Sequence, residues 1–161
     1  MGRNGGKRKD WAMLKRLAGP AFAILLAAGP ALAQTSHTDQ SIDKVLGGHG
    51  ADYRAVFTAF QNAVRDKDKA RIAALVRYPI RVTIGGRKQS IRTAAAFVKN
   101  YDAILTPAIT KVVEDQSYDT LFVNYQGLMF GNGEVWINGI CKNKNCSEIE
   151  PKVVTIQKAP L

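Results

Sequence analysis

Apolar residues recur at every third or fourth position through the middle of the chain, which is the spacing of one face of an α-helix. Between residues 52 and 65 that face consists of Tyr53, Val56, Phe57, Phe60 and Val64. The dipeptide Tyr78-Pro79 ends the second such stretch, because the residue before a proline is disfavoured in helical conformation. Four helices are therefore expected, over residues 52–65, 69–76, 94–105 and 107–115.

Alternation of apolar and polar residues replaces the helical spacing in two places and predicts β-strands. Ile80, Val82 and Ile84 alternate with polar residues, and Gly85-Gly86 provides a tight turn into a partner strand over 87–91. After residue 120, β-forming residues dominate in three segments, 121–130, 134–140 and 152–157. Short turns between these segments predict an antiparallel meander. The expected fold class is α+β, with N-terminal helices packed on a curved, mostly antiparallel sheet.

This order of elements resembles the cone-shaped nuclear transport factor 2-like superfamily, also called cystatin-like or SnoaL-like. The resemblance is carried by Arg77-Tyr78-Pro79-Ile80, by residues 97–102 and by residues 121–137, which look like segments of small exported bacterial proteins of that superfamily. It implies a curved sheet around the helices and a pocket at the open end of the cone. It implies no single activity, because this fold hosts isomerases, dehydratases, ligand carriers and interaction modules.

The first 33 residues have the pattern of a secretory signal peptide. Six basic residues and one acidic residue precede or flank an apolar run over 21–28, and Gly29-Pro30 then breaks any helix. Small residues up to Ala33 predict cleavage between Ala33 and Gln34 and a periplasmic or secreted protein. The glycine-rich segment 34–50 has few apolar residues, so we expect it to be flexible and to precede a single domain over 51–158. No later segment is long and apolar enough to predict a membrane span.

The net charge and the cysteines indicate whether the protein binds nucleic acid or metal ions and whether it forms a disulfide. The chain carries a formal charge of +10, but the leader accounts for about half of it, and the remaining basic residues are scattered. This argues against nucleic-acid binding, which needs a basic patch interleaved with aromatic residues. The two cysteines, Cys141 and Cys146, are expected to form a disulfide in an oxidising compartment. A zinc site is disfavoured because His37 and His49 are the only histidines, so no metal or cofactor is predicted.

Candidate catalytic residues are carboxylates with a nearby phenol. Residues 51–158 contain no histidine, the commonest general base at neutral pH. Asp102 or Glu134 would have to act as the base, with Tyr101 or Tyr125 as the proton donor. Adjacent helical residues point about 100° apart, so Tyr101 and Asp102 are not expected to face one pocket. The favoured interpretation of Asp102 is an exposed helix residue.

Candidate ligand-binding residues lie on the strands. One interpretation of the polar and aromatic strand residues is a binding cleft lined by Asn124, Gln126, Trp136 and Asn138. The favoured interpretation is the solvated face of a one-sided sheet, with Trp136 packed against a helix. Arg81 alternates with Ile80 and Val82, so it faces away from the core or into a pocket mouth. The favoured interpretation is a surface salt-bridge partner, and an anion site is the alternative.

Three functions are compatible with these patterns. The leading hypothesis is a non-enzymatic periplasmic or secreted domain that binds an unknown small molecule or an envelope protein. A small isomerase or dehydratase with a pocket carboxylate is the first alternative. The second is an inhibitor or immunity-type protein that blocks an envelope enzyme through the charged loop Lys142–Asn145. The sequence does not determine whether two copies of the chain form a homodimer through the edges of their sheets.

Overall fold

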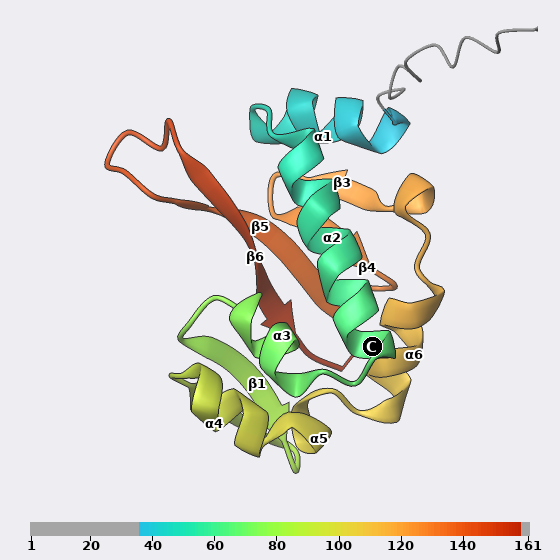
Figure 1. The fold of residues 1–161 in the computed structure, drawn as a ribbon, viewed down its shortest axis with the longest axis vertical. Coiled ribbons are helices and arrows are strands. Elements are labelled where there is room, and N and C mark those ends of the chain that lie inside the picture. The colour runs from blue at the N-terminus through green and yellow to red at the C-terminus, as the bar shows by residue number, and fades with distance from the viewer. Residues whose placement is uncertain (1–35, 159–161) are drawn as a thin grey trace, which may run out of the picture. The chain divides into compact units, whose positions relative to one another are not determined.

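The computed structural model describes residues 36–158. The predicted signal peptide and its cleavage point between Ala33 and Gln34 lie outside the described residues. The helices are α1 (His37–Leu46), α2 (Gly50–Arg65), α3 (Lys69–Ala74), α4 (Ala94–Lys99), α5 (Tyr101–Ile104), α6 (Pro107–Asp115) and the 3-10 turn η1 (Tyr118–Thr120). The strands are β1 (Ile80–Ile84), β2 (Arg87–Ile91), β3 (Phe122–Asn124), β4 (Gly127–Phe130), β5 (Val135–Cys141) and β6 (Ile149–Ile156). The fold is α+β, as the sequence predicts (Figure 1).

The strands form two antiparallel groups. Strands β3, β4, β5 and β6 make one four-stranded sheet in chain order, and β1 pairs with β2 in a separate hairpin. A parallel bridge between Val76 and Val153 joins the segment before β1 to β6. This bridge brings the hairpin beside the last strand of the sheet.

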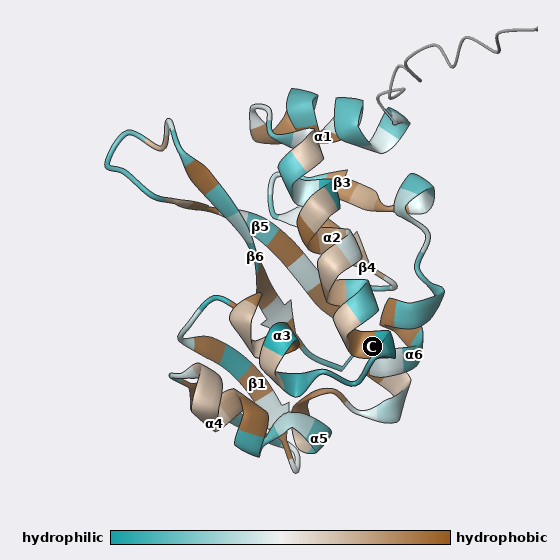
Figure 2. Cartoon of the chain, viewed as in Figure 1, coloured by the Kyte–Doolittle hydropathy of each residue, from teal (hydrophilic) through white to brown (hydrophobic). Residues whose placement is uncertain are grey.

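The core lies between α2 and one face of the four-stranded sheet. Figure 1 shows α2 crossing that face, and Figure 2 shows apolar residues alternating with polar ones along β5. The rings of Phe57 and Phe130 stack with centroids 5.0 Å apart, and Phe60 meets Phe130 edge-on at 5.9 Å. The sheet residues fully buried on this face include Leu128, Phe130, Val135, Ile137 and Val153. The opposite face of the sheet, which carries Trp136, does not pack against α2.

The segment predicted to be flexible contains a helix, so that expectation is wrong. In α1, the Ser36 hydroxyl accepts a hydrogen bond from the Asp39 amide at 3.0 Å, and Gly47 ends the helix in left-handed conformation. Ile42 is completely buried in the common core. Ile42 and Leu46 pack against the core, and the caps satisfy the helix ends, so a segment of polar composition is ordered.

The predicted helix over 94–105 is divided at Asn100. Thr93 caps α4, since its hydroxyl accepts a hydrogen bond from the Ala96 amide at 3.2 Å. The Asn100 side-chain amide donates to the Ala96 carbonyl at 2.8 Å, and its backbone leaves the helical region. An asparagine that bonds to the preceding turn competes with helix continuation.

The segment 121–130 forms a hairpin, β3–β4, where a single strand was predicted. The Asn124 carboxamide oxygen accepts from the Gln126 amide at 2.8 Å, which closes the turn. Gly127 then adopts a φ of +117° at the start of β4. Gly127 therefore lies at the end of a chain reversal, and the meander has four strands.

Candidate binding groove on the open face of the sheet

Two adjoining hollows form a groove beside β6. The first, of about 510 Å³, lies between the β1–β2 hairpin and β6, and its lining includes Arg77, Arg81 and Lys88. The second, of about 430 Å³, lies over β4 and β5, and its lining includes Gln126, Met129 and Trp136. Both hollows share Val154, Thr155 and Gln157. We call this continuous surface the groove.

Strand register places the aromatic part of the groove. Trp136 lies opposite Met129 on β4 and opposite Thr155 on β6, so the three side chains share one face of the sheet. The neighbouring residues on β5, Val135 and Ile137, are completely buried on the α2 side. The alternation of apolar and polar residues in β5 therefore directs Trp136 away from the core, where it is half-buried.

Two of the basic residues of the groove lie on the β1–β2 hairpin, and the third lies just before it. Arg81 alternates with the buried Ile80 and Val82, and Lys88 lies opposite Thr83, on the same face of the hairpin as Arg81. Arg77 is fixed just before β1 by its backbone amide, which donates to the Val153 carbonyl at 2.9 Å. None of these three cations forms an ion pair with a carboxylate within residues 36–158.

Three of the five predicted ligand-binding residues line the groove: Arg81, Gln126 and Trp136. Asn124 instead closes the β3–β4 turn, and the Asn138 side-chain oxygen accepts from the Gly139 amide at 2.7 Å. Arg77, which the sequence offers as a candidate together with Arg81, also lines the groove, whereas Lys88 and Gln157 were missed. Lys88 could have been predicted, because a turn at Gly85-Gly86 sets a register in which Lys88 lies on the same face of the hairpin as Arg81.

The candidate catalytic residues do not converge on one site. The Glu134 carboxylate accepts from the Asn132 amide at 2.7 Å within the β4–β5 turn, and Tyr125 is 79% exposed. Tyr101 is buried, and burial, with the nearby Asp102 and Glu114 carboxylates, raises its pKa.

Tyr101 and Asp102 both line a third, surface hollow of about 430 Å³. The two side chains still differ as the helical spacing predicts, because Tyr101 is buried in the core and Asp102 is an exposed helix residue. The Asp102 side chain is 85% exposed and pairs with the Lys69 ammonium at 3.0 Å. That ammonium also lies 4.7 Å from the centre of the Tyr101 ring. Lys69 thus links the two residues in a surface cluster.

A buried polar cluster joins α1 to the rest of the protein. The Asp39 carboxylate, 3% exposed, accepts from the Tyr118 hydroxyl at 2.7 Å and pairs with the Arg54 guanidinium at 3.1 Å. Burial raises the pKa of the Tyr118 phenol above its ordinary value, and the bond to Asp39 adds to that effect. The sequence reasoning missed this cluster because it expected α1 to be flexible. No buried side-chain polar atom in this cluster lacks a hydrogen-bond partner, as is typical of groups that stabilise packing.

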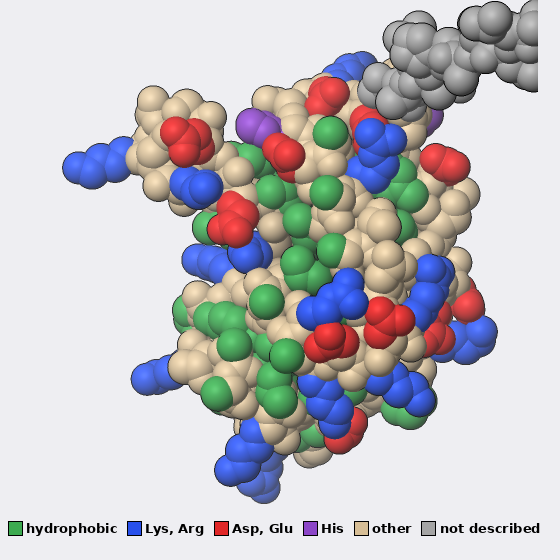
Figure 3. Space-filling model, viewed as in Figure 1, with side chains coloured by type: hydrophobic (Ala, Val, Ile, Leu, Met, Phe, Trp, Pro, Cys, Tyr) green, Lys and Arg blue, Asp and Glu red, His purple; other side chains and the backbone are tan. Residues whose placement is uncertain are grey.

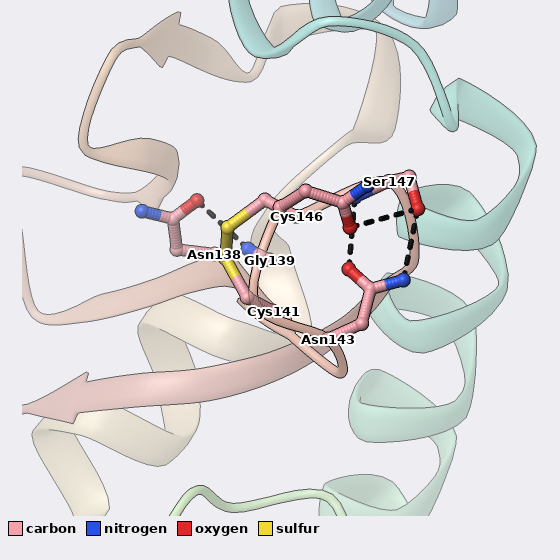
Figure 4. Close-up of a disulfide and its surroundings, with 7 residues drawn as sticks. Asn138, Gly139, Cys141, Asn143, Cys146 and Ser147 are labelled. Carbon is pink, nitrogen blue, oxygen red and sulfur yellow. Dashed lines mark hydrogen bonds between the residues drawn. A yellow bond between two sulfur atoms is a disulfide. The ribbon is translucent and has the colours of Figure 1, made fainter.

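The disulfide between Cys141 and Cys146 closes the tip of the β5–β6 hairpin, with Cα atoms 4.7 Å apart. Inside the loop, the Asn143 side chain bonds to both the amide and the hydroxyl of Ser147, at 3.0 and 2.8 Å (Figure 4). The tip stands out from the body of the domain in Figure 3. The result is an internally bonded, projecting loop.

Comparisons with known proteins give no relative. No protein-family model matches the sequence, and no curated protein or solved structure is significantly similar to it. Within residues 36–158, no three His, Cys, Asp or Glu side chains are grouped to hold a metal ion. None of the helices in that part of the chain has the length and apolarity needed to cross a membrane. The fold and the groove therefore have to supply the functional argument.

Proposed function

We propose that this protein is an exported, non-enzymatic binding domain and that the groove is its binding site for a small molecule. The observation that supports this most is the joining of two hollows into one surface with cations at one end and Trp136 at the other. Small-molecule sites typically combine an apolar wall with a few polar groups that fix orientation. The candidate carboxylates, in contrast, line neither hollow: Glu134 bonds within the β4–β5 turn, and Asp102 lies in a surface cluster.

Export is supported by two independent features. The N-terminal 33 residues have the charge, apolar run and small residues of a signal peptide. The Cys141–Cys146 disulfide fits a compartment where thiols are oxidised. We propose cleavage between Ala33 and Gln34.

Expression of the full chain in a Gram-negative host tests this proposal. The protein should appear in the periplasmic fraction, begin at Gln34 by N-terminal sequencing and contain no free thiol. A full-length protein retained in the cytoplasm or in the inner membrane would contradict export.

A thermal-shift screen of the exported protein with anionic, neutral and cationic small molecules tests the binding site. Cleavage would leave Trp136 as the only tryptophan, because the other is Trp11, so its fluorescence reports on the groove directly. Ligands that raise the melting temperature should change this emission and lose their effect in Trp136→Leu. Tyr125→Ala, at an exposed aromatic outside the groove, is the matched control and should leave binding unchanged. Equal losses in the two variants would argue against the groove.

A second candidate function rests on the projecting loop. A projecting, disulfide-closed loop that carries Lys142 and Lys144 has a shape that can enter the site of another protein. We propose as the alternative that the loop inhibits an envelope enzyme. A photo-cross-linker at position 144 should then trap that enzyme, and its activity should fall as the exported protein is added. Undiminished inhibition by the double variant Lys142→Ala, Lys144→Ala would reject this alternative.

A further inference from the structure

We propose that the ligand of the groove is an organic anion, with a carboxylate or phosphate group joined to a flat apolar body. This inference rests on the proposed function, because it assumes that the groove is a binding site. The groove has two ends of different chemistry, and each end specifies one part of the ligand.

The end between β1–β2 and β6 favours an anion. Its cations come from the segment before β1, from β1 and from β2: Arg77, Arg81 and Lys88. No carboxylate is among the residues that line either hollow. Arg54, Lys69 and Arg71 each pair with an aspartate, whereas the three groove cations have no carboxylate partner within residues 36–158. A guanidinium presents a planar set of donors that matches the geometry of carboxylate and phosphate.

The end over β4 and β5 favours an apolar, flat group. Trp136 and Met129 supply the surface, and Phe122 lies opposite Met129 on β3, so the apolar row continues towards the sheet edge. Phe122 is 53% exposed, which leaves its ring free to extend this surface. An aromatic side chain binds a flat group by offset stacking or edge contact. Gln126 and Asn132 provide the polar rim of this hollow.

The connection between the two ends supports one ligand rather than two. Val154 and Thr155 belong to both hollows. The irregular pairing between Trp136 and Ile137 makes room for Val154 in β6, so the strand bulges where the hollows meet. Each hollow has a volume within the range of about 300–1,000 Å³ that is common for small-molecule sites. A ligand that spans both would have its charge near Arg81 and its flat part near Trp136.

Four probes separate the contributions of charge and apolar surface: 2-naphthoate, 2-naphthyl phosphate, neutral 2-naphthamide and inorganic phosphate. Each is titrated into the exported protein by calorimetry and followed by Trp136 fluorescence. The two naphthyl anions should bind at least about tenfold more tightly than naphthamide, the effect of losing one charged contact. Their affinity should fall as sodium chloride is raised, because salt screens exposed charges. The ratio between naphthoate and naphthyl phosphate distinguishes a carboxylate ligand from a phosphate ligand.

Matched variants locate the two ends. Arg81→Gln and Lys88→Gln should each weaken binding of the naphthyl anions by about fivefold to tenfold. This is the effect expected when one charged contact, partly screened by solvent, is lost. Arg87→Gln makes the same charge change on the opposite face of the same hairpin, so it should leave affinity unchanged. Trp136→Leu should weaken the naphthyl anions but leave any binding of inorganic phosphate unaltered. Melting temperatures of all variants should stay near that of the parent.

Several outcomes would overturn the inference. If naphthamide binds as tightly as the anions, the groove binds apolar molecules, so the charge assignment fails while the proposed function stands. If Arg87→Gln and Arg81→Gln weaken binding equally, the anions respond only to overall charge. If no probe and no member of the wider screen affects Trp136, the proposed function itself fails. A stable dimer that Trp136→Leu dissociates would show that a second copy of the chain covers the groove.

Discussion

Gly127 shows how one residue can determine the path of the chain. Its φ is +117°, and a Cβ atom at this position would collide with the carbonyl oxygen of Ile137 on the neighbouring strand. Both a left-handed backbone and close approach to β5 therefore require glycine here. The residue sits at the start of the strand that carries Leu128 and Phe130 into the core.

We predict that Gly127→Ala lowers the free energy of unfolding by about 2–4 kcal/mol, because backbone strain and a steric clash add. Urea unfolding followed by circular dichroism measures the change. Gly86→Ala is the control, since Gly86 also has positive φ (+77°) but open space around its Cβ position. Gly86→Ala should lower the free energy of unfolding by about 1 kcal/mol, because it introduces backbone strain without a steric clash. Similar losses in both variants would show that the contact with Ile137 is unimportant.

At the scale of single residues, the sequence predicted positions on regular strands better than positions in turns. Alternation left a cleft as one of two interpretations for Arg81 and Trp136, and both residues line the groove. Asn124 and Glu134 were expected on a strand face, but each bonds to a backbone amide two residues away and shapes a turn. Such local bonds compete with strand geometry, and periodicity contains no information on which of the two prevails.

At the scale of elements, the sequence predicted helices and strands wherever the apolar spacing was regular. Helix α2 and the β1–β2 hairpin agree with the sequence to within two residues. Helix α1 was missed because only Ile42 and Leu46 mark an apolar face in a polar segment. What stabilises α1 is its contact with distant residues, such as the bond from the Thr38 hydroxyl to the Tyr118 carbonyl at 2.9 Å. Contacts of this kind come only with the tertiary fold.

The importance of α1 can be measured at Ile42. This side chain is completely buried, so Ile42→Ala should lower the free energy of unfolding by about 2–4 kcal/mol through lost packing and a remaining cavity. Val45 lies on the same helix with 44% exposure, and Val45→Ala should change stability by less than about 0.5 kcal/mol. Equilibrium unfolding of both variants is the measurement. If Ile42→Ala were as mild as Val45→Ala, α1 would contribute little to the core.

The disulfide belongs to the β5–β6 hairpin, and its effect should stay local. Replacing both cysteines by serine should destabilise the protein by about 2 kcal/mol, the loop-entropy value for so short a loop. Trp136 lies five residues along β5 from Cys141, so ligand affinity at the groove should not change. Reduction of the parent protein with dithiothreitol should reproduce the stability of the double variant. A loss of groove binding on reduction would show that the hairpin tip and the groove are coupled.

At the scale of the whole molecule, the order of the predicted elements was enough to predict the fold class. It was not enough to predict the groove. The α2 face of the sheet consists of the apolar residues that every sequence pattern identifies, including Leu128 and Ile137. The groove depends on where the hairpin lies beside β6, which is set by the Val76–Val153 bridge and by the Arg77 amide bond to Val153. Pairing between segments so far apart in the chain leaves no periodic signal in either one.

The whole molecule also has a predictable response to alkali. Burial raises the pKa of Tyr78 to about 12, and it raises the pKa of Tyr118 as well, where ionisation would also place a phenolate beside the Asp39 carboxylate. In the unfolded chain a tyrosine loses its proton near pH 10. Below pH 10 both states keep these protons, so their contribution to stability is constant. Above pH 10 the unfolded state binds fewer protons than the folded state, and the free energy of unfolding must fall as pH rises.

The expected slope is about 1.4 kcal/mol per pH unit for each tyrosine that stays protonated in the folded state between pH 10 and 12. Urea unfolding at pH 9, 10, 10.5 and 11 measures it, and phenolate absorbance at 295 nm should show fewer ionised tyrosines in the folded protein than in urea. In Tyr78→Phe the slope should be shallower by about one such increment, since one titrating group is gone. Identical titration of folded and unfolded protein would mean that these phenols are open to solvent, contrary to the burial that raises their pKa.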